Sequence, residues 1–302
     1  MKIKANKLQI EVEDTGGSGE VVVLIMGLGM QLVAWPVELV QALVQQGYRV
    51  ILHDNRDIGL SEKFDHLGTP NLFWESVKFR MGLSTKPPYT LHDMAQDTLG
   101  VLDTLGIQRA HIVGASMGGM IAQHVAIAAP RRALSLTSIM SSSGARSLPG
   151  PKAEVLRVMM ARPKGRDREA VLRHYVRLLR AIGSPGFPMD EALVRQRISA
   201  GLDRSPYAPQ GTMRQMVAIA ADTGRAKALT GVQAPTLVLH GLADPLVPYA
   251  CGEDTARRID GARLVGISGM GHDLPPPVIE RLLPPMLEHF ARTGPNTPHP
   301  IP

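Results

Sequence analysis

The stretch Gly114-Ala115-Ser116-Met117-Gly118-Gly119 decides the fold, because it places a serine between glycines where an apolar strand meets a helix. Residues 110–113 (Ala-His-Ile-Val) have the apolar character of a strand. A helix is predicted from Met120 to Ala129, where apolar residues recur at helical spacing until Pro130 stops it. Such a sharp turn strains the backbone at Ser116 and requires small neighbours. The pattern therefore predicts a nucleophile elbow that projects the Ser116 hydroxyl into open space.

Apolar strand-like runs alternate with helical segments on both sides of this turn. Strand-helix-strand units pair their strands in parallel, so the alternation predicts an α/β fold with a mostly parallel central sheet and flanking helices. An N-terminal hairpin on the sheet edge is expected at residues 3–5 and 8–12. The strands expected after it are residues 21–26, 49–52, 110–113, 134–140, 236–240 and 263–267, and the early helices are residues 36–46 and 91–105.

The strand signal vanishes between Leu148 and Lys227 and returns after Gln233-Ala234-Pro235. Helical patterns replace it at residues 152–161, 168–181, 190–200 and 210–221. We therefore expect residues 1–144 and 228–302 to form the α/β core, and residues 145–227 to form an inserted helical cap, or lid. The proline-rich end, residues 294–302, is predicted to be a disordered tail.

The charge distribution is uneven, although the net charge of the 302 residues is only +6. The segment 145–227 holds 16 Lys and Arg against 7 Asp and Glu. A solvated helical surface explains this surplus, and attraction of anionic substrates or membrane surfaces is the alternative. A nucleic-acid partner is not expected, because the segment lacks interleaved aromatic residues and a recognition motif.

The chain ends and the cysteine content indicate a cytoplasmic protein. The N-terminus lacks the apolar core and cleavage site of a secretion signal, and no apolar run reaches the length of an integral membrane segment. The single cysteine, Cys251, has no partner for an internal disulfide and is expected to be a buried, inert thiol.

Two later residues supply what a serine nucleophile needs, namely a base and a group that orients the base. His272 follows the last expected strand in the loop Ser268-Gly269-Met270-Gly271-His272. Asp244 follows the preceding strand in His240-Gly241-Leu242-Ala243-Asp244-Pro245. The carboxyl ends of parallel strands lie at one edge of a sheet, so Ser116, Asp244 and His272 are expected to meet there as a catalytic triad.

These motifs resemble the α/β-hydrolase fold family over nearly the whole chain, from about Val21 to Ala291. The segment Asp54-Asn55-Arg56-Asp57-Ile58-Gly59-Leu60-Ser61 and the preceding Met26-Gly27-Leu28-Gly29 add to the match. The likeness is greatest to the bacterial branch that contains aclacinomycin methylesterase and related carboxylesterases.

The resemblance implies an oxyanion hole made of backbone N–H groups, here those of Met117 and Leu28, with Gly29 as the alternative to Leu28. The chain departs from the commoner family pattern at Met26, where a histidine usually precedes the glycine. Backbone donors do not depend on that side chain, so the hole is expected to survive.

Other polar residues near these motifs have structural explanations. His53, His111 and His124 are expected to fill core or surface positions, and Asp54 and Arg56 to brace loops. Asp273 is a rival orienter, but a helix N-cap is the better interpretation, since it precedes Leu274-Pro275. No metal-binding or dinucleotide motif occurs, so neither a metal nor a cofactor is expected.

The sequence therefore predicts a serine hydrolase that cleaves small-molecule carboxylic esters (the EC 3.1.1 type) through an acyl-enzyme intermediate. Carbon–carbon bond hydrolases, lactonases, amidases and cofactor-free perhydrolases share the triad and remain alternatives. A serine at the elbow disfavours haloalkane dehalogenases and epoxide hydrolases, which resembling enzymes build on aspartate. A non-catalytic ligand receptor and a lipid-surface enzyme are further hypotheses, and the substrate and quaternary state stay open.

The expected cap is rich in methionine. These residues suit an adaptable apolar pocket, and ordinary core filling explains them equally well: Met159, Met160, Met189, Met213 and Met216.

Overall fold

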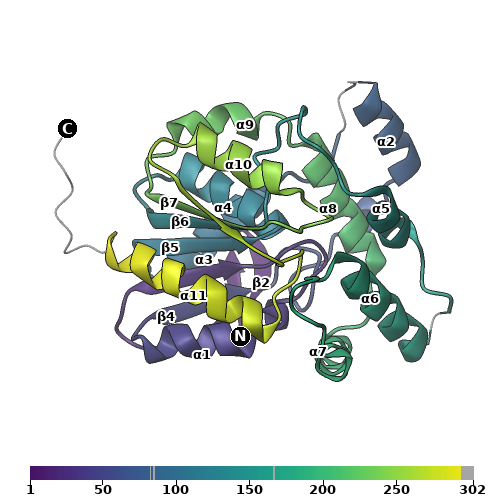
Figure 1. Ribbon diagram of the computed structural model, residues 1–302, viewed down its shortest axis with the longest axis horizontal. Helices are drawn as coiled ribbons and strands as arrows, with labels where there is room; N and C mark the ends of the chain where they lie inside the picture. The colour runs from purple at the N-terminus through teal and green to yellow at the C-terminus, as the bar shows by residue number, and fades with distance from the viewer. Residues whose placement is uncertain (82, 84–85, 166, 294–302) are drawn as a thin grey trace.

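The computed structural model describes residues 1–81, 83, 86–165 and 167–293. Its centre is an eight-stranded sheet (Figure 1) in which β1 and β2 form an antiparallel hairpin, β2 pairs antiparallel with β4, and all later pairs are parallel. The predicted edge hairpin and mostly parallel sheet are thereby confirmed. In spatial order the strands are β1 (Lys2–Ala5), β2 (Leu8–Asp14), β4 (Arg49–His53), β3 (Val21–Ile25), β5 (Ala110–Ala115), β6 (Ala133–Ile139), β7 (Thr236–Gly241) and β8 (Arg263–Ile267).

Helices cover both faces of this sheet (Figure 1). Neighbouring residues of β5 show the consequence, because Ile112 and Val113 are fully buried in two different apolar clusters on opposite faces. A strand buried on both sides is expected to be mainly apolar, as β5 is apart from His111. One face carries α1 (Val37–Gln45) and α11 (Pro276–Ala291), and the other carries α3 (Leu91–Thr104), α4 (Met117–Ala128), α9 (Arg225–Ala228) and α10 (Tyr249–Arg258).

A second group of helices lies beyond one end of the sheet, at the right of Figure 1. The predicted helices of the segment 145–227 all occur, with ends within a few residues of the predicted ones. They are α5 (Ala153–Met160), α6 (Arg168–Ile182), α7 (Glu191–Arg204) and α8 (Pro209–Ala221), and they are joined there by α2 (Leu72–Arg80), which the sequence pattern did not indicate.

Short 3₁₀ turns complete the described elements, at Leu32–Ala34, Asp65–Leu67 and Leu229–Gly231. The tail predicted to be disordered, residues 294–302, lies outside the described residues. Among the helices of the described residues, none has both the length and the apolar character needed to cross a bilayer.

Candidate active site

The elbow is built as the glycine pattern predicts. Ser116 has φ 55° and ψ −121°, a strained conformation for a residue with a side chain. A Cβ atom on Gly118 would lie 1.9 Å from the carbonyl oxygen of Ile25, and one on Gly114 would lie 2.1 Å from that of Gly118. The glycines therefore provide clearance that no other residue allows. Helix α4 begins at Met117, three residues earlier than predicted, so its N-terminus directly follows the serine.

The structure brings the three predicted catalytic residues together at the carboxyl ends of their strands. His272 Nε2 lies 2.9 Å from Ser116 Oγ, and His272 Nδ1 lies 2.7 Å from Asp244 Oδ2. The other carboxylate oxygen, Asp244 Oδ1, accepts the backbone N–H groups of Leu246 (2.9 Å) and Val247 (2.8 Å). Because Oδ1 is occupied, Oδ2 is available to His272 and holds a proton on Nδ1. The Nε2 lone pair then faces the serine hydroxyl.

A second histidine lies behind Asp244 without competing for Ser116. His240 Nε2 lies 2.8 Å from the carbonyl oxygen of Val247, to which it donates, and 3.6 Å from Asp244 Oδ2. Burial lowers the pKa of His240, so the ring is neutral near pH 7 and adds no positive charge beside the carboxylate.

The loop that carries His272 is attached to the segment after α6. The backbone N–H of His272 donates to the carbonyl oxygen of Ile182 (2.7 Å), and that of Gly271 donates to Ser184 Oγ (2.9 Å). A third bond runs from the N–H of Gly186 to the carbonyl oxygen of Gly269 (2.9 Å). Residues 182–186, far from His272 in sequence, thus hold its loop in position beside the elbow.

The N-cap role predicted for Asp273 is wrong. Helix α11 begins at Pro276, and its N-cap is Pro275, which makes no side-chain capping bond. The Asp273 carboxylate instead accepts the hydroxyl of Ser184. Burial raises the pKa of Asp273 above that of an exposed aspartate, although the Ser184 bond opposes this. The carboxylate that contacts His272 Nδ1 is that of Asp244.

The loop after β3 approaches the elbow closely. A Cβ atom on Gly27 would lie 3.2 Å from Ser116 Cβ. The N–H of Gly29 donates to Gln215 Oε1 (3.0 Å), whereas no described residue accepts the N–H of Leu28. On the other side of the serine, Met117 is the first residue of α4, where a backbone N–H has no partner within its own helix. Among the described residues, the N–H of Leu28 is therefore without an acceptor, whereas that of Gly29 has one.

Two residues that brace this site were not singled out from the sequence. Asn55 Nδ2 donates to the carbonyl oxygen of Met26 (2.8 Å), at the start of the loop after β3. Ser141 Oγ donates to the carbonyl oxygen of Ser116 (2.7 Å). Asn55 belongs to the segment 54–61 quoted above, and Ser141 begins the serine run 141–143 after β6. Neither sequence pattern indicates which backbone atom the side chain contacts.

A cavity of about 2000 Å³ extends from Ser116 and His272 between the core and the helices α5 to α8. All five methionines noted in the sequence line it, namely Met159, Met160, Met189, Met213 and Met216. Its lining is mainly apolar, which suits a bulky apolar group next to the serine.

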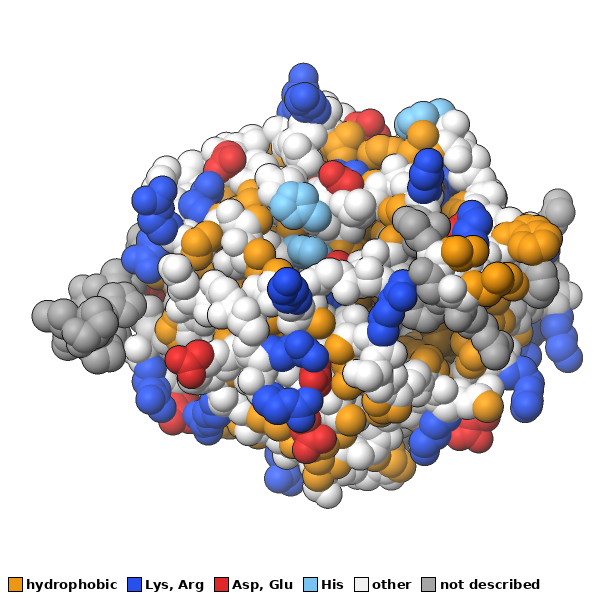
Figure 2. Space-filling model, turned by 90° about the horizontal axis from the view of Figure 1, so that it is seen from above, with side chains coloured by type: hydrophobic (Ala, Val, Ile, Leu, Met, Phe, Trp, Pro, Cys, Tyr) orange, Lys and Arg blue, Asp and Glu red, His pale blue; other side chains and the backbone are white. Residues whose placement is uncertain are grey.

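Some of the basic residues of the segment 145–227 pair at the surface with acidic residues of the same segment. Arg168 pairs with Asp203, Arg180 with Glu191, and Arg195 with Glu169 (2.8 Å). Figure 2 shows Lys and Arg side chains spread over one face of the molecule, with Asp and Glu side chains between them. This distribution agrees with the interpretation as a solvated surface.

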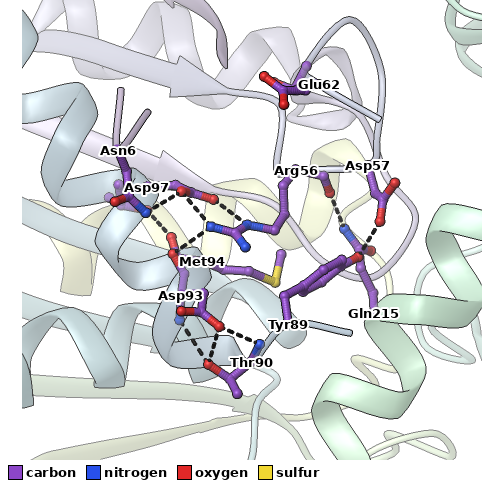
Figure 3. A network of polar contacts seen from close by, with 12 residues as sticks. Asn6, Arg56, Asp57, Glu62, Tyr89, Thr90, Asp93, Met94, Asp97 and Gln215 are labelled. Atoms are coloured by element: carbon purple, nitrogen blue, oxygen red, sulfur yellow. Dashed lines mark hydrogen bonds and ion pairs between the residues drawn. The ribbon is translucent and has the colours of Figure 1, made fainter. Parts of the chain in front are cut away.

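The other residues weighed from the sequence have partners outside the triad. His53 contacts Thr98, His111 contacts Ser135 and Glu20, and His124 contacts Asp222. Asp54 accepts the N–H groups of Leu32 and Leu60, and the side chain of Arg204. Arg56 forms a buried pair with Asp97 at 2.6 and 2.7 Å (Figure 3). Cys251 is buried and its pKa is raised by that burial, which agrees with an inert thiol.

In the described part of the chain, no group of three or more His, Cys, Asp or Glu side chains is arranged to bind a metal ion.

Known proteins resemble this chain over most of its length. The chain is 29% identical over 284 residues to rhodomycin D methylesterase DnrP of Streptomyces peucetius. The aligned region covers 88% of this chain and 89% of that protein. It is 30% identical over 253 residues to a 2-hydroxy-6-oxononadienedioate/2-hydroxy-6-oxononatrienedioate hydrolase of Paraburkholderia phymatum, covering 82% of this chain and 78% of that protein.

Solved structures share the fold at lower identity. The enol-lactonase of Burkholderia xenovorans matches with a TM-score of 0.69 and 22% identity, over 96% of this chain and 100% of that one. The family model of the alpha/beta hydrolase fold matches residues 20–275. The chain therefore belongs to the alpha/beta hydrolase fold family.

Proposed function

We propose that this protein is a serine hydrolase that cleaves carboxylic esters through an acyl-enzyme intermediate. The observation that carries the proposal is the continuous hydrogen-bonded chain from Ser116 Oγ through His272 to Asp244, with distances of 2.9 and 2.7 Å. A base within hydrogen-bond reach is what converts a serine hydroxyl into a nucleophile.

The reaction follows from this geometry. His272 Nε2 takes the proton of Ser116 as Oγ attacks the ester carbonyl, and Asp244 stabilises the imidazolium without accepting its proton. The N–H groups of Leu28 and Met117 bind the oxyanion. The imidazolium then protonates the leaving alkoxide, and an acyl-serine remains. Water attacks the acyl group with His272 as base, which releases the acid and restores Ser116.

The cavity and the relatives together support a class of substrate. We propose alkyl esters of large, mainly apolar acids, because the cavity of about 2000 Å³ far exceeds what a small ester needs. The DnrP relative is a methylesterase by name, which favours a small alcohol and a large acyl part. Residues 145–227 act in this proposal as a cap that encloses the acyl group.

Carbon–carbon bond hydrolysis is the second candidate, and the relative from Paraburkholderia phymatum is the observation that favours it. A panel of methyl esters, lactones and vinylogous diketones, each with small and large acyl groups, separates the candidates. Turnover of the large methyl esters at the highest kcat/KM supports the proposal, whereas a higher kcat/KM for the diketone replaces it with the second candidate.

Replacement of the nucleophile tests the mechanism itself. Ser116→Ala is expected to lower ester turnover by about 10⁴-fold or more, since the oxyanion hole alone leaves only residual catalysis. A fluorophosphonate probe should label the natural protein at Ser116 and leave the variant unlabelled. Retention of most turnover in a variant with an unchanged melting temperature would contradict the assignment of Ser116.

A further inference from the structure

Gln215 reaches from α8 into the backbone of the loop after β3. Its side chain is fully buried and uses both ends of its amide: Oε1 accepts the N–H of Gly29 (3.0 Å), and Nε2 donates to the carbonyl oxygen of Arg56 (3.0 Å). These partners fix the amide orientation, because a flipped amide would place donor against donor and acceptor against acceptor. Gln215 therefore has one stable position, between two loops of the core.

Helix α8 is seated too closely on these loops to let Gln215 drift. A Cβ atom on Gly29 would lie 2.8 Å from Thr212 Oγ1, and one on Gly211 would lie 2.5 Å from the carbonyl oxygen of Asp57. Arg214, the residue before Gln215, forms two bonds of 2.7 and 2.8 Å with the Asp57 carboxylate. Both Arg214 and Asp57 are almost fully buried, so this ion pair is expensive to break.

The loop that accepts Gln215 is itself anchored to the core. Figure 3 shows the Gln215 amide facing the backbone of Arg56, while the guanidinium of Arg56 points away toward Asp97 on α3. Asp97 also accepts Asn6 Nδ2 (2.8 Å) from the turn of the N-terminal hairpin. Gln215 thus connects the position of Gly29 to a buried polar network of the core.

We propose that Gln215 is a positioning residue for the oxyanion hole. By accepting the N–H of Gly29 it holds that group away from the serine and leaves the N–H of Leu28 as the donor beside Met117. The inference rests on the proposed function, because an oxyanion hole matters only if Ser116 attacks a carbonyl. It assigns to α8, from the expected cap segment, a direct part in setting catalytic geometry in the core.

Gln215→Met removes both hydrogen bonds while nearly keeping the side-chain volume. We expect kcat to fall by about 10- to 10³-fold, the range for a lost or misplaced oxyanion donor, with KM within about threefold. Affinity for an alkylboronic acid, which forms a tetrahedral adduct with the serine, should fall in parallel with kcat. Affinity for the product carboxylate, a ground-state ligand, should stay nearly unchanged.

Ser205→Ala is the matched control. Ser205 Oγ donates from the end of α7 to the carbonyl oxygen of Gly59 (2.9 Å), so this variant also loses a buried bond to the core but leaves Gly29 untouched. It is expected to keep kcat and boronic acid affinity within about twofold. A merely structural Gln215 would lower the melting temperature of Gln215→Met and leave its kcat and boronic acid affinity unchanged, which would overturn the inference.

An exchange measurement on the natural protein keeps the inference testable if Gln215→Met does not fold. The amide proton of Gly29 should exchange with solvent slowly and that of Leu28 quickly, in nuclear magnetic resonance spectra without ligand. Equal exchange rates would overturn the inference. A natural protein without Ser116-dependent turnover would instead refute the proposed function, so the two failures are distinguishable.

Discussion

In the proposed triad, Asp244 acts on His272 through the constraint on its other carboxylate oxygen, Oδ1. Oδ1 accepts two backbone N–H groups, from Leu246 and Val247, and these donors require an acceptor at that position. Only Oδ2 is then free for His272 Nδ1, so the carboxylate acts on the ring as a pure acceptor. The two N–H groups thus determine the tautomer of His272 indirectly, by determining which atom Asp244 presents to it.

Asp244→Asn should therefore inactivate the protein with little change in structure. The two N–H groups would hold the asparagine oxygen at the Oδ1 position, which turns the side-chain NH₂ toward His272 Nδ1. The ring would then carry its proton on Nε2 and could not take the proton of Ser116. We expect kcat to fall by about 10³- to 10⁴-fold, measured with the preferred methyl ester.

The matched control is Cys251→Ser, a near-isosteric change of a buried residue on the neighbouring α10. It should keep kcat within about threefold of the natural protein. A comparable loss in both variants would show that the region tolerates no change, and would remove the tautomer as the explanation. Full activity of Asp244→Asn would remove Asp244 from the triad.

Sequence reasoning found Ser116, Asp244 and His272 because each follows a recognisable strand in a glycine-containing loop. It did not find Gln215 or Ser184, whose bonds join residues 186 and 87 positions apart. Nothing local distinguishes a glutamine on a cap helix from a solvent-exposed one. The contact between Gln215 and Gly29 became visible only when the fold placed α8 on the loop after β3.

At the scale of elements, the segment after α6 and the loop of His272 behave as one unit. Ser184 Oγ accepts the N–H of Gly271 and donates to the carboxylate of Asp273 on the other side of His272. A Cβ atom on Gly271 would lie 2.3 Å from the carbonyl oxygen of Gly183, so the two backbones are in close contact. A motion that separated them would displace His272, the proposed base, so any opening of the proposed cap is expected elsewhere along the cavity.

Ser184→Ala tests this connection. It leaves the N–H of Gly271 and the buried carboxylate of Asp273 without their hydroxyl partner, which should lower the free energy of unfolding by about 1–3 kcal/mol. We expect kcat to fall as well, because His272 lies between the two released groups. Both quantities are measured by denaturant unfolding and by ester turnover.

Ser184→Thr keeps the hydroxyl and should restore most of both quantities. If alanine and threonine had equal effects, the hydroxyl would not be the connecting group. If alanine lowered stability but left kcat unchanged, the segment after α6 would hold the fold together without positioning His272.

Three helices show why sequence patterns predict some helices and miss others. The buried face of α10 consists of Cys251, Gly252, Asp254 and Thr255, so the helix has no apolar stripe to detect. Asp254 is held there by Arg258 (2.6 Å) and Ser143, which are ionic and polar contacts with no sequence period. The helices α6 and α8 do show apolar periodicity and were predicted nearly to the residue.

For the whole molecule, buried histidines set the response to acid. Burial lowers the pKa of His53, His111 and His240, and it lowers the pKa of His289 to about 4, with nearby His111 adding to the effect. In the unfolded chain each ring has an ordinary pKa near 6.5. The unfolded state therefore binds protons below about pH 6.5 that the folded state does not bind.

This difference predicts that the folded state loses stability as the pH falls. Above pH 6.5 these rings are neutral in both states and do not lower the free energy of unfolding. Below pH 6.5 the free energy of unfolding declines by about 1.4 kcal/mol per pH unit for each such histidine, until the folded ring is itself protonated, which for His289 is near pH 4. His289→Gln should therefore reduce the drop in melting temperature between pH 7 and pH 5, measured by calorimetry at constant ionic strength. His66→Gln is the control, because His66 is exposed and its replacement should leave the slope unchanged. An identical slope in the His289 variant and the natural protein would show that other groups, such as the ion pairs of Asp57 and Asp254, dominate acid unfolding.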